Sequence, residues 1–251
     1  YGFNRGFGHN VDLAVPPDRL ADLQRNLLRS HAAGMGDFAP RRVVRAAMFL
    51  RAVSLARGFS GVRPVVVERL VELLNRGVTP CVPRFGSVGA SGDLAPLSHI
   101  AVVLLGEGEA TVGDDPAVLD GGEALRQAGI ESLALEMKEG LALNNGMQFS
   151  TAMGILSYFQ AKRLLKTASV ATALSAQVML GADTPFREDV HRLRRHPGAR
   201  TVARWIFDLM QDSPIRRAHA PYTIDGEVQE ESIAQEAKPP CSKRKTLTKK
   251  I

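Results

Sequence analysis

The chain has 251 residues, of which 45% are hydrophobic and 23% charged, so it is long enough to bury a sizeable core and is ordinary for a globular protein. No apolar run approaches the roughly 20 residues of a membrane helix, no secretory pattern occurs and two cysteines give no disulfide framework, so we expect a cytoplasmic protein without a membrane partner. The net charge of +6 arises between Lys238 and Lys250, where no acidic residue occurs, so the rest of the chain gives no reason to expect a nucleic-acid partner.

The N-terminal part of the chain contains three predicted helices. The first begins after Asp18, a candidate N-cap, and its apolar face consists of Leu20, Leu23, Leu27 and Leu28. The second spans 41–57, with Gly58 at the position that commonly ends a helix. The third begins at Pro64, which suits a first helical turn, and ends before Gly77. Its predicted buried face consists of Val67, Leu70, Val71 and Leu74.

The rest of the chain is also predicted to be mainly α. Residues 94–105 form a buried apolar segment, and 109–112 form one strand of a small pair. The absence of proline from 145 to 180 predicts one long helix that begins a few residues late, and this length favours a bundle. No strand–helix alternation occurs, which excludes a doubly wound sheet. Residues 223–251 are predicted to be a disordered basic tail; a nuclear address or a contact with an acidic partner is the alternative.

The most informative stretch runs from Gly86 to His99 and reads GSVGASGDLAPLSH. A phosphate-binding loop needs a lysine that is missing here, and a hydrolase elbow needs glycine where Asp93 stands. The glycines of a dinucleotide-binding loop have a different spacing. Ser87, Asp93 and His99 include residue types of a catalytic triad, but their spacing sets no mutual geometry.

This stretch resembles the signature of the aromatic amino acid ammonia-lyases, and most closely that of the histidine branch. The resemblance implies that Ala90, Ser91 and Gly92 cyclise by themselves into 4-methylidene-imidazol-5-one, an electrophilic prosthetic group, so that no external cofactor is needed. The Gly92 nitrogen attacks the Ala90 carbonyl and two waters are lost. Glycine permits the tight turn that this attack needs, and the serine hydroxyl can be eliminated. Asp93 is implied as a supporting residue.

The first residues, YGFNRGFG, resemble the YG-x-N-T-GFG loop of the same family. The resemblance implies that Tyr1 is the base that removes the β-proton of the substrate, with Gly8 as a supporting residue. A phenol acts as a base only where neighbouring donors or positive charge favour its anion. Arg5 stands where the family usually has threonine, and we interpret it as an exposed residue.

Two further segments resemble segments of the family that indicate histidine as the substrate. SHAAG resembles the segment whose histidine, here His31, contacts the substrate ring. KEGLALNNGMQ resembles KEGLAL-x-NGTQ, in which Asn145 is implied to hydrogen-bond the prosthetic group and Gln148 marks the histidine branch.

His191 and His196 are five residues apart and do not share a helix face well, so we predict no metal site there.

The resemblance implies elimination of ammonia from L-histidine, a small-molecule substrate, to give trans-urocanate. It also implies a long-helix bundle of the ammonia-lyase/fumarase-like type, of which 1–222 would be the N-terminal and early central part, and a homotetramer with shared active sites. In a straight alignment, Ser232 and Gln235 stand where the family has a second tyrosine and a carboxylate-binding arginine, and the chain is about half the family's length. The alternatives are a tyrosine or phenylalanine lyase or aminomutase with the same group, and a non-catalytic lyase fragment that binds a partner.

Overall fold

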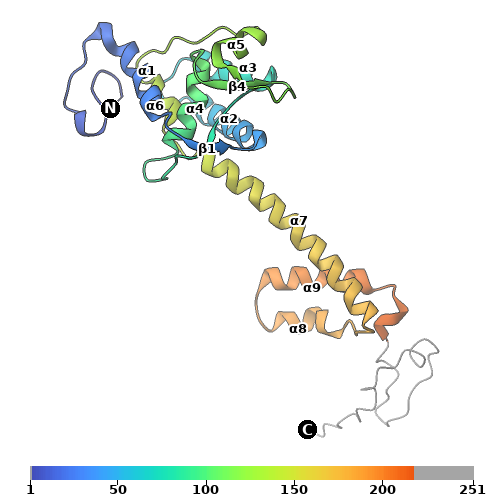
Figure 1. Cartoon of the computed structure of the whole chain (residues 1–251). Helices are drawn as coiled ribbons and strands as arrows, with labels where there is room; N and C mark the ends of the chain where they lie inside the picture. The colour runs from blue at the N-terminus through green and yellow to red at the C-terminus, as the bar shows by residue number, and fades with distance from the viewer. Residues whose placement is uncertain (1, 218–251) are drawn as a thin grey trace, which may run out of the picture. The chain divides into compact units, whose positions relative to one another are not determined.

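The computed structural model describes residues 2–217, which are mainly helical (Figure 1). They form two compact units, the first ending at Tyr158 and the second beginning at Phe159. The boundary lies inside helix α7 (Gln148–Val178), so one continuous helix contributes to both units. The predicted basic tail, 223–251, lies outside the described residues.

The first unit combines short helices with short strands. Its helices are α1 (Leu20–His31), α2 (Arg41–Ala56), α3 (Pro64–Asn75), α4 (Leu94–Leu104), α5 (Gly121–Gln127), α6 (Glu139–Asn144) and the start of α7, with the 3-10 turns η1 (Gly8–Asn10) and η2 (Pro17–Arg19). Its strands are β1 (Met35–Phe38), β2 (Val78–Pro80), β3 (Pro83–Phe85), β4 (Glu109–Val112) and β5 (Leu119–Asp120). Strand β4 lies between β2 and β5 in an antiparallel sheet, and β1 pairs antiparallel with β3.

The β1–β3 pair brings two connections of the chain together. Met35, just after the end of α1, lies opposite Phe85, just before the glycine-rich loop. The register is irregular between Met35 and Phe38, the second of which lies opposite Pro83. As a result, the segment that follows His31 runs beside the segment that leads into the loop.

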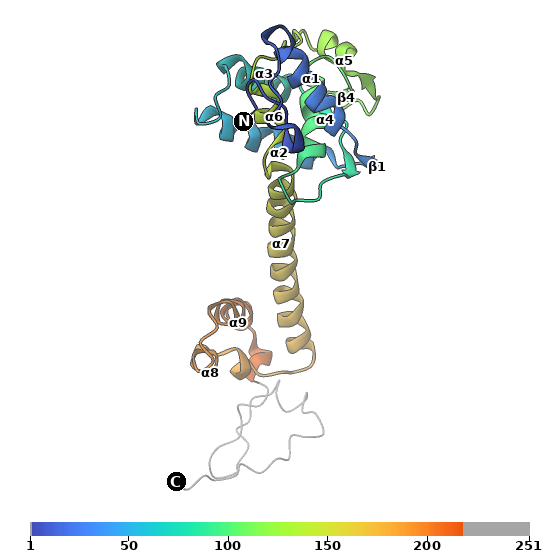
Figure 2. The same ribbon diagram turned by 90° about the vertical axis from the view of Figure 1, so that its left-hand side faces the viewer.

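Helix α4 is central to the core of the first unit. Its sequence is apolar almost all round, which is typical of a helix buried on every side. From Pro96 to Leu104 its residues are buried, apart from His99, which is half-buried. It packs against α1, α5 and α6, and Figures 1 and 2 both show it beside α1 and α6. The helix that follows the glycine-rich loop is therefore fixed by the core itself.

The sequence-based prediction of these elements is largely confirmed. The predicted helix 41–57 is α2, and Gly58, which follows it, has a φ of +81°. Pro64 is the first residue of α3. The apolar segment 94–105 contains α4, and 109–112 is β4, which pairs on both of its edges. The long helix predicted over 145–180 is α7, which begins at Gln148 as expected.

The predicted N-cap at Asp18 is wrong. Helix α1 begins at Leu20 and its N-cap residue is Arg19, which makes no side-chain capping hydrogen bond. The cause is the 3-10 turn Pro17–Arg19, which includes Asp18 and so places it ahead of the capping position.

The predicted buried face of α3 is right only in part. Leu70 is buried, and Val67 and Leu74 are partly buried against the same core, but Val71 is 40% exposed. The other fully buried residues of this helix are Val66 and Leu73. The sequence of α3 is apolar on more than one side, so the pattern alone allows two neighbouring stripes. Packing of α3 against α2 and β2 decides between them.

The second unit is built on the C-terminal part of α7, and the elements that follow are η3 (Thr184–Phe186), α8 (Glu188–Arg192), α9 (Pro197–Met210) and η4 (Pro214–Arg217). Its small core consists of Ala173, Ile206 and Met210, with Ala176, Phe186 and Val202 packed against them. Trp205 on α9 has the ammonium of Lys166 over its ring, 5.9 Å from the ring centre. The second unit therefore has its own, much smaller core.

We expect Leu73→Ala to lower the free energy of unfolding of the first unit by about 2–5 kcal/mol, because it removes a fully buried side chain and leaves a cavity. Val71→Ala, on the exposed side of the same helix, should change it by less than about 0.5 kcal/mol. Urea-dependent hydrogen–deuterium exchange of peptides from α4 measures both. Equal losses in the two variants would mean that the buried face of α3 is assigned wrongly.

Candidate active site

The glycine-rich loop connects β3 to α4, and its tip is exposed. Residues 85–91 are exposed, whereas Gly92 and Asp93 are buried. Gly92 has a φ of +103°, a conformation that residues with a side chain rarely adopt. A Cβ atom at this position would also stand 2.8 Å from the Gly146 carbonyl oxygen. Both constraints require glycine, and they leave Ser91 at the surface on a tight turn.

Asp93 ties the end of this loop to the start of α7. Its carboxylate accepts hydrogen bonds from the Ser87 hydroxyl (2.7 Å), the Ser150 backbone N–H (2.8 Å) and the Ser150 hydroxyl (2.5 Å). Ser150 lies in the first turn of α7, where unpaired N–H groups favour a negative charge. The backbone N–H of Asp93 donates to the Gly146 carbonyl over 2.6 Å. The buried carboxylate therefore joins two helix N-termini.

Asn145 lies directly against the predicted tripeptide. Its side-chain amide donates to the carbonyl oxygen of Ser91. Asn145 follows α6 and precedes α7, so the same short connection carries both Asn145 and the Gly146 carbonyl. The structure thus places Asn145 and Asp93 in contact with the two ends of the Ser91–Gly92 turn.

Gln148, the first residue of α7, is bound from the other side by a buried arginine. Its side-chain oxygen accepts from Nη1 of Arg51 over 2.9 Å. Arg51 lies on α2 and is 5% exposed. Burial lowers the pKa of its guanidinium to about 10, which still leaves it charged at neutral pH. A buried positive charge therefore lies beneath the connection that bears Asn145.

Helix α6, which leads into that connection, is anchored at its start by the buried carboxylate of Glu139. Arg63 donates to this carboxylate through Nε and Nη2, both over 2.8 Å, and through its backbone N–H over 3.1 Å. The backbone N–H of Glu136 adds a fourth hydrogen bond of 2.8 Å. Burial opposes ionisation of Glu139, but the hydrogen bonds from Arg63 and Glu136 outweigh it, so the pKa of Glu139 lies below its usual value.

Gln24 on α1 ties the N-terminal loop to α6. Its side chain is fully buried, donates to the Gly2 carbonyl over 3.2 Å and accepts from the Gly140 backbone N–H over 3.0 Å. The predicted base Tyr1 itself lies outside the described residues. Gly8, the other predicted residue of this loop, is exposed in η1. Gln24 thus fixes the backbone next to Tyr1 against the helix that precedes Asn145.

Two histidines flank the path from α1 to the glycine-rich loop. His31 Nδ1 lies 2.9 Å from the Leu27 carbonyl oxygen and 3.0 Å from the Ser30 hydroxyl oxygen, so this ring nitrogen is engaged by its own helix. His99 Nε2 accepts from the Gly34 backbone N–H over 3.0 Å. Burial lowers the pKa of His99, which keeps this acceptor unprotonated. The Asp93 carboxylate accepts directly from Ser87 and Ser150, with no histidine between Ser87 and Asp93, so the hydrogen-bond order is not that of a triad.

Sequence reasoning did not single out Gln24, Arg51 or His99 as positioning groups. For Gln24 and Arg51 the sequence did contain a signal, because each stands at the spacing of the apolar residues that form the buried face of its helix. Gln24 follows Leu20 by four residues, and Arg51 lies between Met48 and Leu55 at spacings of three and four. A polar residue inside an apolar stripe predicts a buried hydrogen-bonding role.

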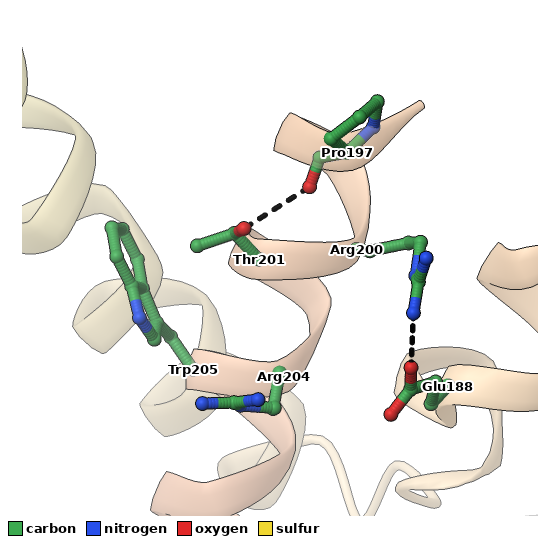
Figure 3. Close-up of a pocket in the computed structure, with 6 residues that line it drawn as sticks. All are labelled: Glu188, Pro197, Arg200, Thr201, Arg204 and Trp205. Carbon is green, nitrogen blue, oxygen red and sulfur yellow. Dashed lines mark hydrogen bonds and ion pairs between the residues drawn. The ribbon is translucent and has the colours of Figure 1, made fainter. Parts of the chain in front are cut away.

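A separate pocket of about 280 Å³ lies in the second unit. Figure 3 shows the residues that line it: Glu188, Pro197, Arg200, Thr201, Arg204 and Trp205. Arg200 is paired with Glu188, and the Thr201 hydroxyl donates to the Pro197 carbonyl over 3.0 Å, so much of the polar lining is already engaged within the pocket. The first unit therefore holds the stronger candidate site.

Residues 2–217 contain no group of three or more His, Cys, Asp or Glu side chains placed to hold a metal ion. Over the same range, no helix has both the length and the hydropathy needed to cross a bilayer. The candidate site of the first unit contains a serine on a tight glycine turn, with an amide donor at the serine carbonyl.

Comparisons with known proteins show which family and which folds the chain is similar to. The sequence pattern of the family described as aromatic amino acid lyase matches residues 1–238. The chain is 50% identical over 220 residues to the histidine ammonia-lyase of Gloeobacter violaceus, and the matched region covers 88% of this chain and 42% of that protein. Two solved structures are similar. Phenylalanine aminomutase of Pantoea agglomerans has a TM-score of 0.83 and 35% identity, and the match covers 100% of this chain and 45% of that one. Histidine ammonia-lyase of Trypanosoma cruzi has a TM-score of 0.78 and 38% identity, and the match covers 87% of this chain and 42% of that one.

The mainly helical fold is therefore the one shared by ammonia-lyases and aminomutases, which confirms the predicted fold class. The chain belongs to the aromatic amino acid lyase family, as its glycine-rich stretch predicted. It spans less than half the length of the relatives it matches.

We expect Glu139→Gln to lower the free energy of unfolding of the first unit by about 1–3 kcal/mol at neutral pH, because donors that serve a buried carboxylate lose their charged acceptor. The native pKa of Glu139 lies below its usual value of 4.5, so its contribution is present above 4.5 and is lost as the pH falls through the native pKa. The gap between the wild type and the variant should therefore narrow at acidic pH. Urea unfolding at several pH values measures it, and a gap independent of pH would contradict the assignment.

Proposed function

We propose that this chain supplies the tripeptide and its supporting residues to an ammonia-lyase that converts L-histidine into trans-urocanate and ammonia. The observation that carries the proposal is the tight turn at Gly92 with the Asn145 amide on the Ser91 carbonyl. The 50% identity to a histidine ammonia-lyase supports histidine as the substrate. Because the chain spans 42% of that relative, the activity of the whole protein is part of the proposal.

The residues fit the prosthetic group that the family resemblance implies. Gly92 has no room for a side chain, Ser91 is exposed, and Asn145 donates to the carbonyl oxygen that a cyclised tripeptide would keep. In the cyclisation, the Gly92 nitrogen bonds to the Ala90 carbonyl carbon. The carbonyl oxygen leaves as water with the amide protons of Gly92 and Ser91, and the Ser91 hydroxyl leaves as a second water with the Ser91 Cα proton. No oxidant or external cofactor is required.

When formed, this group supplies an electrophile that makes an amino acid easier to deaminate. Tyr1 is the proposed base for the β-proton of the substrate, and Gln24 holds the adjacent Gly2 in place. The amide of Asn145 orients the reactive tripeptide and stabilises negative charge on its carbonyl oxygen. Asp93 holds the loop in place, and Gly8 is the proposed supporting residue of the Tyr1 loop.

His31 and Gln148 are the proposed residues that select an imidazole ring. In the neutral tautomer with the proton at Nδ1, the form that can donate to the Leu27 carbonyl, His31 presents Nε2 as an acceptor for a ring N–H. The side-chain oxygen of Gln148 is bound by Arg51, so its amide nitrogen is the end that can donate to the other ring nitrogen. This acceptor–donor pair matches the neutral imidazole of histidine.

We further propose that residues 1–222 are the N-terminal and early central part of the lyase domain, with 223–251 as a basic tail. A homotetramer in the cytoplasm is the proposed assembly, following the family resemblance. A small-molecule amino acid is the proposed partner.

The second candidate function is that of an aminomutase or a lyase acting on phenylalanine or tyrosine. The observation that favours it is the TM-score of 0.83 with a phenylalanine aminomutase. That protein is 35% identical to this chain, against 50% for the histidine ammonia-lyase, so histidine is better supported. Incubation with histidine, phenylalanine and tyrosine separates the candidates: urocanate supports the first, and cinnamate, coumarate or a β-amino acid supports the second.

We expect the purified chain to have a mass two waters below the value of its sequence, with the loss mapped to the peptide that contains Ala90, Ser91 and Gly92. Ser91→Ala should abolish the loss, because it removes the hydroxyl that must leave. Ser132→Ala, which alters an exposed serine elsewhere in the first unit, should leave the loss unchanged. Intact-mass and peptide-mapping mass spectrometry measure all three. An unmodified wild-type chain would reject the enzyme function for this chain and favour a lyase fragment that only binds a partner.

A further inference from the structure

Arg51 is a buried cation without an anionic partner in the described part of the chain. It lies on the core-facing side of α2 and is 5% exposed. None of the ion pairs among residues 2–217 includes it, and its Nε nitrogen is buried without a hydrogen-bond partner. Burying an unpaired guanidinium is costly, so a fold retains one where its hydrogen bonds serve a purpose.

Among the described residues, all the hydrogen bonds that the Arg51 side chain donates go to one short segment, 142–148. Nη1 donates to the side-chain oxygen of Gln148 over 2.9 Å. Nη2 donates to the backbone carbonyls of Ala142 and Asn145, the second over 2.9 Å. One guanidinium thus holds the end of α6, the connection and the start of α7 in a fixed relation.

The same segment holds the tripeptide from the other side. The Asn145 side chain donates to the Ser91 carbonyl, and the Gly146 carbonyl accepts from the Asp93 backbone N–H over 2.6 Å. A Cβ on Gly146 would collide with Arg51 Nη1, and a Cβ on Gly92 would stand 2.8 Å from the Gly146 oxygen. The Gly146 peptide is therefore packed between the guanidinium and the turn.

We propose that Arg51 is a positioning residue for the cyclisation of Ala90-Ser91-Gly92, acting through the segment 142–148. The inference rests on the proposed function and deepens it, because it assigns a residue to the formation of the group. By fixing Asn145 and the Gly146 carbonyl, Arg51 keeps the turn in the geometry that brings the Gly92 nitrogen to the Ala90 carbonyl carbon. Lysine keeps the charge but lacks the planar fork that reaches three acceptors, so it replaces Arg51 only in part.

Arg45 on the same helix offers a matched control. Its Nη2 donates to the Leu74 carbonyl over 3.0 Å, and its Nη1 is buried without a hydrogen-bond partner. It is therefore another arginine of α2 with a buried, unsatisfied nitrogen, but its contact lies at the end of α3 instead of the candidate site. A general effect of disturbing α2 should appear equally in variants of both residues.

The experiment compares Arg51→Gln and Arg51→Lys with Arg45→Gln and Arg45→Lys in the full 251-residue chain. Intact-mass spectrometry measures the fraction that has lost two waters over time, and thermal unfolding measures stability. We expect both Arg51 variants to cyclise slower by roughly 10- to 100-fold, the scale of a small misplacement of reacting groups. The Arg45 variants should cyclise at the wild-type rate. Hydrogen exchange should rise in 142–148 for the Arg51 variants only.

The outcomes separate the two proposals. If the wild type cyclises and the Arg51 variants cyclise at the same rate, the positioning role of Arg51 is wrong and the proposed function stands. If slowing follows thermal stability in all four variants, Arg51 is merely structural and the inference is overturned. If Arg51→Gln fails to fold, Arg51→Lys decides, since it keeps the charge. A wild-type chain that never loses water overturns the proposed function and the inference with it.

Discussion

The first unit depends on one buried carboxylate, that of Asp93, which joins the start of α4 to the start of α7. Because α4 is central to the core, Asp93 is fixed in place by the hydrophobic packing around it. Its three hydrogen bonds then transmit that rigidity to the loop before it and to the helix after Asn145. The exposed tip of the loop can therefore have a defined shape without packing contacts of its own.

Other buried polar side chains repeat this principle at the remaining joints. Gln24 fixes the N-terminal loop, Glu139 fixes the start of α6, and Arg51 fixes its end. Each one serves backbone or charged groups that the core would otherwise leave unsatisfied. The apolar core supplies stability, whereas these polar contacts decide which loops meet.

The helices could be predicted because the periodic spacing of their apolar residues, and the prolines and glycines at their ends, are local signals in the sequence. The prediction failed at Asp18, where a 3-10 turn takes the place of the cap. It failed in part on α3, where Val71 is exposed because consecutive valines allow two faces. At the candidate site, the family resemblance implied roles for Asn145, Asp93 and the tripeptide; the structure places them in contact, and their roles stay predictions. The roles of Arg51 and Gln24 depend on partners far away in sequence, so helical spacing indicates that they are buried but not what they bind.

Trp205 places a fluorescent probe in the second of the two units. It is the only tryptophan of the chain and belongs to the second unit, so its emission reports directly on the packing of that unit. Helix α7 nevertheless runs through the boundary between the units. A fluorescence transition that coincides with loss of amide protection in α4 would mean that this helix makes the two units melt as one cooperative body. Separate transitions would mean that α7 can fray at one end while the other end keeps the candidate site intact.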